Sequence, residues 1–367
     1  MARSDETDGM RGRRVGQHGM EPNPRNSVRS VILGAGVLVV LVLALLRYGP
    51  VRLFERQQPA DEAAVDVSAT SASTAPVVAT SVPTVDAPIA VGTATIDLVD
   101  STRPTEARGN TPASGARSLR VVVRYPTMGV ASEEEFPDAT PSGQFPLIVF
   151  AHGYNASTDT YAALLHDIAA SGFVVAAVEF PLTSSAYPGN PVQMDLVNEP
   201  ADISFVIDSL LGATPPAPLV DAIAKTKVGV IGHSDGAMAV LLTAYAPRYV
   251  DPRIGMVVSI AGGYDTYGGA WFSASSAPLL VIHGTLDEVT PYSRSEELAA
   301  MDPHDVMFVA AEGASHIGPA IAPEYEPVIA RVVSESFAWR LLGSTAAAAS
   351  TLIDADTPPL RIVSVRG

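Results

Sequence analysis

One pentapeptide constrains the fold of this 367-residue chain more than any other feature. Gly232-His233-Ser234-Asp235-Gly236 follows an apolar run at residues 228–231 and precedes a helix-forming stretch that begins at Ala237. A strand, a tight turn and a helix in this order are typical of a nucleophile elbow, which holds a serine hydroxyl above the edge of a sheet. The glycines permit a strained turn, and the first amides of the helix point to where negative charge develops. The motif predicts that Ser234 is a nucleophile.

The sequence around this motif alternates between apolar, β-branched runs and amphipathic helical patterns. Near-continuous apolar strands separated by helices are typical of a mostly parallel sheet that is covered on both faces. The chain therefore predicts an α/β fold. The predicted strands cover residues 119–125, 147–151, 173–180, 228–231, 256–260, 279–283 and 306–309, and the clearest predicted helices cover 161–170, 203–210 and 328–341.

A nucleophilic serine needs a base, an acid that orients the base, and donors for the oxyanion. On a sheet of this kind the groups follow the carboxyl ends of strands, in the order Ser, Asp or Glu, His. Asp287 follows the glycine turn after the strand at 279–283 and is the predicted acid, with Asp265 as the alternative. His316, in a loop of small residues after the strand at 306–309, is the predicted base.

The turn after the strand at 147–151 is the expected source of an oxyanion donor. It reads His-Gly-Tyr-Asn, and the amide of Tyr154 is the predicted first donor. The amide of Asp235, directly after the nucleophile, is the predicted second donor. Asn155 and Tyr187 are candidate pocket residues. Tyr187 belongs to a polar, Pro- and Gly-containing segment, 181–199, that is expected to arch over the pocket or else to be an ordinary surface loop.

With these residues in place, the domain resembles the α/β-hydrolase superfamily. Within it, the domain is similar to the dienelactone-hydrolase-like and platelet-activating-factor-acetylhydrolase-like branch, with cutinase-like polyesterases and chlorophyllases as near relatives. The resemblance covers about 115–342. It implies an α/β-hydrolase fold and hydrolysis of carboxylic esters through a Ser-His-Asp triad and an acyl-enzyme, without metal or cofactor. It is carried by Arg124-Tyr125-Pro126, residues 146–153, 172–178 and 202–208, the elbow, and the loops of Asp287 and His316.

Two departures from the family pattern bear on the substrate. Ala237 stands where relatives often have a second glycine, but alanine is small enough to keep the helix close to the strand. Asp235 replaces the Met, Gln or Phe that the polyesterases carry beside the nucleophile, so polyester hydrolysis is not expected. A small ester or a lipid-like ester is the expected substrate. An acyltransferase with an alcohol acceptor, and an inactive binding module on the same fold, are the rival functions.

Composition excludes other classes of function. The net charge is −16, and residues 1–56 carry nine Arg against five acidic residues, so the rest of the chain sums to about −20. An acidic body of this kind lacks the basic footprint of a nucleic-acid-binding protein. The chain has no cysteine, which excludes disulfides, thiol catalysis, thiolate metal sites and a lipid-modified cysteine.

An uninterrupted apolar run at residues 31–46 predicts an N-terminal membrane segment. Arginines are more numerous before it than after it, which favours a cytoplasmic N-terminus. An uncleaved signal anchor, and hence a single-pass protein of the cell membrane with an extracytoplasmic domain, is therefore the preferred reading. A cleaved signal, which would make the protein secreted, and a buried core helix are the alternatives.

The predicted domain organisation follows from these shifts in composition. Its segments are a cytoplasmic disordered tail at 1–27, a transmembrane signal anchor at 28–50, a flexible Ala/Ser/Thr/Pro-rich stalk at 51–90, the catalytic domain at 91–342, and a loosely attached C-terminal tail at 343–367.

Overall fold

The structure is a computed structural model that describes residues 89–265, 269–273 and 275–367. The predicted tail at 1–27, the predicted anchor at 28–50 and nearly all of the predicted stalk lie outside these residues. Among the helices of the described ranges, none combines the length and the apolar character that crossing a bilayer requires.

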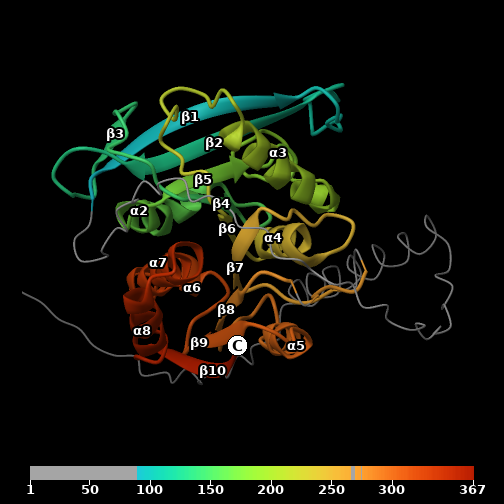
Figure 1. Cartoon of the computed structure of the whole chain (residues 1–367). Helices are drawn as coiled ribbons and strands as arrows, with labels where there is room; N and C mark the ends of the chain where they lie inside the picture. The colour runs from blue at the N-terminus through green and yellow to red at the C-terminus, as the bar shows by residue number, and fades with distance from the viewer. Residues whose placement is uncertain (1–88, 266–268, 274) are drawn as a thin grey trace, which may run out of the picture. The chain divides into compact units, whose positions relative to one another are not determined.

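Ten strands of the described chain form one mixed sheet, in the order β10-β9-β8-β7-β6-β4-β5-β2-β1-β3 (Figure 1). The six neighbours β5, β4, β6, β7, β8 and β9 run parallel, as predicted. β2 pairs antiparallel with both β5 and β1, and β10 pairs antiparallel with β9. The bounds are β1 (Val91–Asp100), β2 (Arg117–Pro126), β3 (Glu135–Pro137), β4 (Leu147–Ala151), β5 (Val174–Glu179), β6 (Val228–His233), β7 (Ile254–Ile260), β8 (Leu279–Gly284), β9 (Val306–Ala311) and β10 (Leu360–Arg366).

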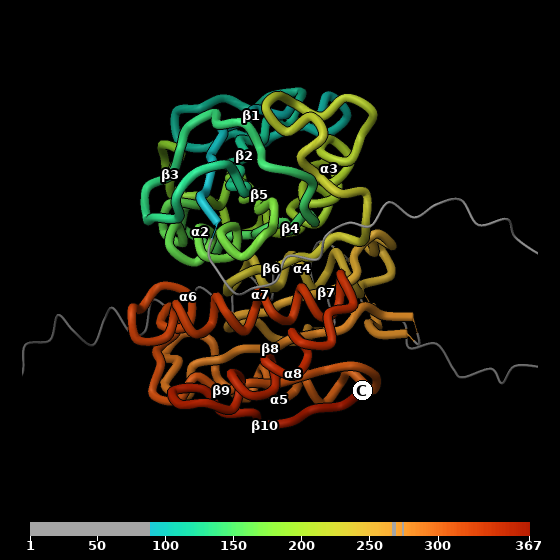
Figure 2. Tube along the Cα trace, turned by 60° about the vertical axis from the view of Figure 1, so that its left-hand side comes forward, coloured from blue at the N-terminus to red at the C-terminus, as the bar shows by residue number. Residues whose placement is uncertain are grey.

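Helices cover both faces of the sheet (Figures 1 and 2). Each face has its own core: one contains Ile203, Leu241 and Leu298, and the other contains Leu164 and Phe337. Because β4, β5, β8 and β9 are buried along their whole length, their apolar residues run without alternation. One face carries α2 (Ala162–Ala170), α6 (Gly318–Ile321), α7 (Glu326–Leu342) and α8 (Thr345–Asp354), and the other carries α3 (Glu199–Leu211), α4 (Asp235–Tyr245) and α5 (Ser293–Met301).

The C-terminal residues correct one prediction, because 343–367 are part of the fold and not a loose tail. α8 packs against α7, and β10 extends the sheet with Leu360 paired to Ala311. The Ser344 side chain accepts a hydrogen bond from the amide of Ala347 and so caps α8. The alanine-rich sequence misled the prediction because it lacks large apolar side chains. Small residues such as Ala347, which is buried, instead let α8 lie close to its neighbour.

Candidate active site

The predicted elbow is a strained turn between β6 and α4. Ser234 has φ 57° and ψ −122°, a conformation that costs a non-glycine residue about 1–3 kcal/mol. A Cβ atom on Gly232 would lie 2.2 Å from the carbonyl oxygen of Gly236, and one on Gly236 would lie 2.2 Å from that of Ala151. Both positions therefore require glycine, and the turn lifts Ser234 to the carboxyl edge of the sheet.

Ser234, His316 and Asp287 meet at this edge. The Ser234 Oγ lies 3.0 Å from Nε2 of His316, and Nδ1 of His316 lies 2.8 Å from Oδ2 of Asp287. With the proton on Nδ1, the imidazole donates to the carboxylate and presents a free Nε2 lone pair to the serine hydroxyl. The loops after β6, β8 and β9 thus bring together the predicted nucleophile, the predicted base and the predicted acid.

The Asp287 carboxylate is held in one orientation by three neighbours besides His316. Its side chain is buried, and Oδ1 accepts hydrogen bonds from the amides of Val289 and Thr290, both at 2.8 Å. The Nε2 atom of buried His283 lies 3.0 Å from Oδ2, and burial lowers the pKa of that imidazole. Asp265, the alternative acid, is exposed in the loop after β7. The contact with Nδ1 of His316 favours Asp287.

A buried relay joins the loop of the base to the elbow and to the turn after β4. His233 Nε2 donates to the carbonyl oxygen of His316 at 3.0 Å. Its Nδ1 accepts from the hydroxyl of Tyr161 at 2.9 Å, and that hydroxyl accepts from the amide of Gly153 at 3.2 Å. Burial lowers the pKa of His233 to about 4, so the imidazole is neutral, as these bonds require.

Sequence reasoning missed this relay, because His233 occupies the variable position of the elbow. A sequence signal was nevertheless present: His233 is a histidine beside the nucleophile on a fully buried strand, and such a side chain needs hydrogen-bond partners. Tyr161 carried no comparable signal, since its position also fits the apolar stripe of the predicted helix.

The predicted oxyanion donors are available. Within the described part of the chain, the amides of Tyr154 and Asp235 have no hydrogen-bond acceptor. A Cβ atom on Gly153 would lie only 3.2 Å from Cβ of Ser234, so the turn after β4 passes directly beside the nucleophile. The Tyr154 hydroxyl donates to the carbonyl oxygen of Pro191 at 3.0 Å, which ties this turn to the segment 181–199.

The segment 181–199 runs along the site and contains the short helix η2 (Gln193–Val197). The amide of Asn155, an exposed residue, donates to the carbonyl oxygen of Thr183 at 2.9 Å. Nε2 of Gln193 donates to Oδ2 of Asp235 at 2.9 Å, beside the nucleophile. The segment thus contacts both loops that carry the candidate oxyanion donors, as an arch over the pocket would require.

Tyr187 lies elsewhere. It lines a cavity of about 230 Å³ with Arg108 and other residues of the connection between β1 and β2, and no triad residue lines that cavity. Burial raises the pKa of its hydroxyl, which is near Glu179 and Arg120. The structure therefore does not bring this predicted pocket residue to Ser234. Sequence could place Tyr187 in the loop but could not tell which way its side chain turns.

A second cavity and the distribution of metal-ligating side chains bear on where else a ligand could bind. A cavity of about 490 Å³ between α2 and α7 is also lined by no triad residue. In the described ranges, His, Asp and Glu side chains form no group of three suited to a metal ion.

Comparisons with known proteins place the chain among serine hydrolases. Residues 114–202 match the family model described as platelet-activating factor acetylhydrolase, isoform II, and residues 218–328 match serine hydrolase (FSH1). A ferulic acid esterase from Streptomyces cinnamoneus has a similar structure, with a TM-score of 0.57 and 20% identity over 76% of this chain and 99% of that chain. No curated protein matches the chain in sequence. Residues 203–217 separate the two matches, and Ser234, Asp287 and His316 all lie within the second.

Proposed function

We propose that this chain is a carboxylic-ester hydrolase that works through Ser234, His316 and Asp287. Its similarity to the platelet-activating-factor-acetylhydrolase and serine hydrolase families supports the activity. One observation carries the proposal. Two contacts, of 3.0 and 2.8 Å, join these side chains in series from the hydroxyl to the buried carboxylate. This is the arrangement by which a base activates a serine while an acid fixes the tautomer of the base.

The proposed reaction has two halves. Ser234 Oγ attacks the ester carbonyl carbon while His316 Nε2 takes the hydroxyl proton, and the amides of Tyr154 and Asp235 donate to the resulting oxyanion. The C–O bond to the alcohol then breaks, and the imidazolium returns the proton to the leaving oxygen. Water repeats the sequence on the acyl-enzyme and releases the acid. Asp287 stabilises the imidazolium in both halves without taking its proton.

We also propose the cellular setting. The sixteen uncharged apolar residues at 31–46, with arginines mostly before them, support a single-pass anchor at 28–50 with the hydrolase domain outside the cytoplasm. The substrate would then be a small or lipid-like ester that reaches the outer face of the membrane.

Labelling with a fluorophosphonate probe tests the assignment of the nucleophile. The full chain, purified in detergent, should be labelled, and Ser234→Ala and His316→Ala should not. Ser118→Ala, which removes an exposed hydroxyl on β2, is the matched control and should be labelled like the wild type. Undiminished labelling of Ser234→Ala, or none of a folded wild type, would contradict the proposal.

A further inference from the structure

Asp235 places a carboxylate next to the nucleophile. It is the first residue of α4, is half-buried, and accepts a hydrogen bond at Oδ2 from Nε2 of Gln193 at 2.9 Å. Burial raises the pKa of Asp235, whereas the bond from Gln193 and the charge of nearby His316 lower it. Among the described residues, no lysine or arginine lies within ion-pair distance of this carboxylate. Its only hydrogen-bonded side-chain partner there is thus an amide.

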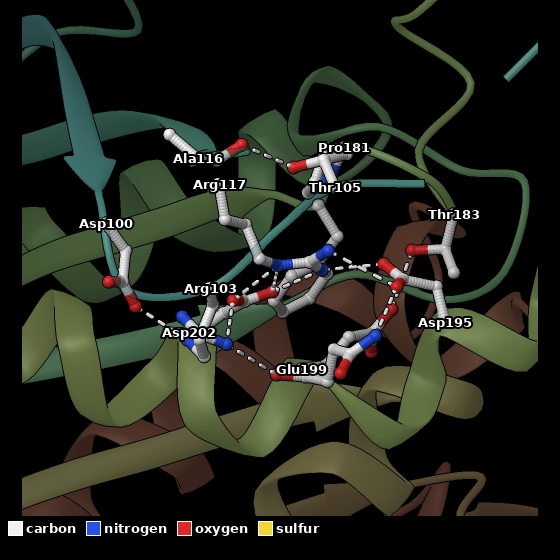
Figure 3. Close-up of polar contacts among 12 residues, drawn as sticks. Asp100, Arg103, Thr105, Ala116, Arg117, Pro181, Thr183, Asp195, Glu199 and Asp202 are labelled. Atoms are coloured by element: carbon white, nitrogen blue, oxygen red, sulfur yellow. Dashed lines mark hydrogen bonds and ion pairs between the residues drawn. The ribbon is translucent and has the colours of Figure 1, made fainter. Parts of the chain in front are cut away.

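Gln193 is held in place from the far side of its short helix. Asp195, two residues along η2, receives hydrogen bonds from Nη2 of Arg117 and Nδ2 of Asn198, both at 2.6 Å. Arg117 is 1% exposed and also binds Asp202 on α3 (Figure 3). The first residue of β2 therefore fixes the helix that carries Gln193.

Two more arginines fix the remainder of the segment. Arg108 donates to the carbonyl oxygen of Pro181 at 3.1 Å and to that of Gly189 at 3.0 Å. Arg103 donates to the carbonyl oxygen of Asn198 at 3.3 Å. Since both ends and the middle of 181–199 are tied to the connection between β1 and β2, the segment forms a fixed wall beside Asp235.

We propose that Asp235 and Gln193 determine substrate specificity by charge: the site accepts uncharged or cationic esters and disfavours esters with an anionic group beside the reacting carbonyl. The inference rests on the proposed function. A carboxylate that the wall holds beside Ser234 repels a like charge on the substrate. At the partly solvated edge of a protein, one such pair is expected to change the rate ratio about five- to tenfold.

The test compares two aryl acetates that differ in charge, 3-acetoxybenzoate and 3-acetoxy-N-methylbenzamide. The readout is the ratio of kcat/KM for the neutral ester to kcat/KM for the anionic ester, in which a loss of turnover common to both esters cancels. The wild type should favour the neutral ester. Asp235→Asn removes the negative charge, and Gln193→Lys keeps the carboxylate but places a cation beside it. Each variant should therefore lower the ratio about five- to tenfold. Asp208→Asn, an exposed carboxylate on α3, is the matched control.

Fluorophosphonate labelling of each variant separates the two proposals. A labelled wild type that hydrolyses neither acetate, or a wild type that is not labelled, counts against the ester-hydrolase function itself. A lower ratio in either labelled variant, absent from Asp208→Asn, supports the charge filter. A ratio within twofold of the wild type in both labelled variants would overturn it, and so would a wild type that prefers the anionic ester.

Discussion

The two sides of the site are built in different ways. On one side, Asp287 and His316 follow neighbouring parallel strands, and backbone amides and neutral imidazoles hold them. On the other side, the segment 181–199 is held by arginines that precede it by some 80 residues in the chain. On the triad side, the parallel strands of the sheet position Asp287 and His316. The wall formed by 181–199 is held by buried ion pairs. Substitutions on the triad side should therefore change turnover, and substitutions in the wall should change stability.

The largest expected effect is on the triad side and concerns turnover. Asp287→Asn keeps the shape of the acid but stabilises the wrong tautomer of His316, so kcat should fall about 10⁴-fold with little change in stability. Asp265→Asn, the matched control, should keep most of its activity. Steady-state kinetics on a simple aryl ester checks both. A larger loss of kcat in Asp265→Asn than in Asp287→Asn would show that Asp265 is the acid that orients His316.

Substitution of the buried arginine that holds the wall should lower the stability of the protein. Arg117→Met leaves the carboxylates of Asp195 and Asp202 buried without their shared cation, so the free energy of unfolding should fall by about 3–5 kcal/mol. Arg120→Met breaks an exposed ion pair with Asp97 and should change the free energy of unfolding by less than about 1 kcal/mol. Urea unfolding of the two variants gives the comparison. Equal losses would show that the buried ion pairs do not hold the wall.

The relay of hydrogen bonds through His233 and Tyr161 lies on the triad side, but no sequence motif predicts it. His233→Phe keeps a ring but leaves the carbonyl of His316 and the hydroxyl of Tyr161 without their partner. We expect kcat to fall about 10- to 100-fold, since a lost buried hydrogen bond costs about 1–3 kcal/mol and here displaces the base. Tyr161→Phe should lose less, because the bond to His316 remains. Wild-type turnover in His233→Phe would show that the relay does not position the base.

The smallest expected effect is a pH dependence of the wall. Glu199 is buried, its Oε1 accepts from the hydroxyl of Thr183, and burial raises its pKa well above 4.5, with nearby Asp202 and Asp195 adding to the shift. A carboxyl whose folded pKa is raised costs stability as pH climbs above the unfolded value. Glu199→Gln should therefore match the wild type near pH 4.5 and have the higher Tm at pH 8.

Thermal unfolding at several pH values measures this difference. Glu106→Gln, in the connection between β1 and β2, is the exposed control and should show no such trend. A Tm difference that is constant with pH would show that folding does not raise the pKa of Glu199.

The sequence predicted the central strands and the three residues of the proposed triad, which the structure brings together, because both depend on short patterns. A run such as 147–151 needs only its own residues to indicate a buried strand, and Ser234, Asp287 and His316 each follow such a run. The predicted strand at 119–125 is β2, which pairs antiparallel with β5, but the outer strands β1, β3 and β10 were missed. Residues of β1 and β10 are only partly buried, so neither strand has the continuous apolar run that marks the central strands.

By itself, then, the sequence determined the parallel sheet, the elbow and the order of the proposed nucleophile, acid and base, since the strand ends of one sheet meet at one edge whatever surrounds them. Only the tertiary structure decided that His233 bonds to the backbone of His316, that Tyr187 lines a separate cavity, and that Arg117 fixes the helix beside Asp235. Those contacts join segments with no fixed spacing, and a single side chain's direction depends on which distant partner satisfies it.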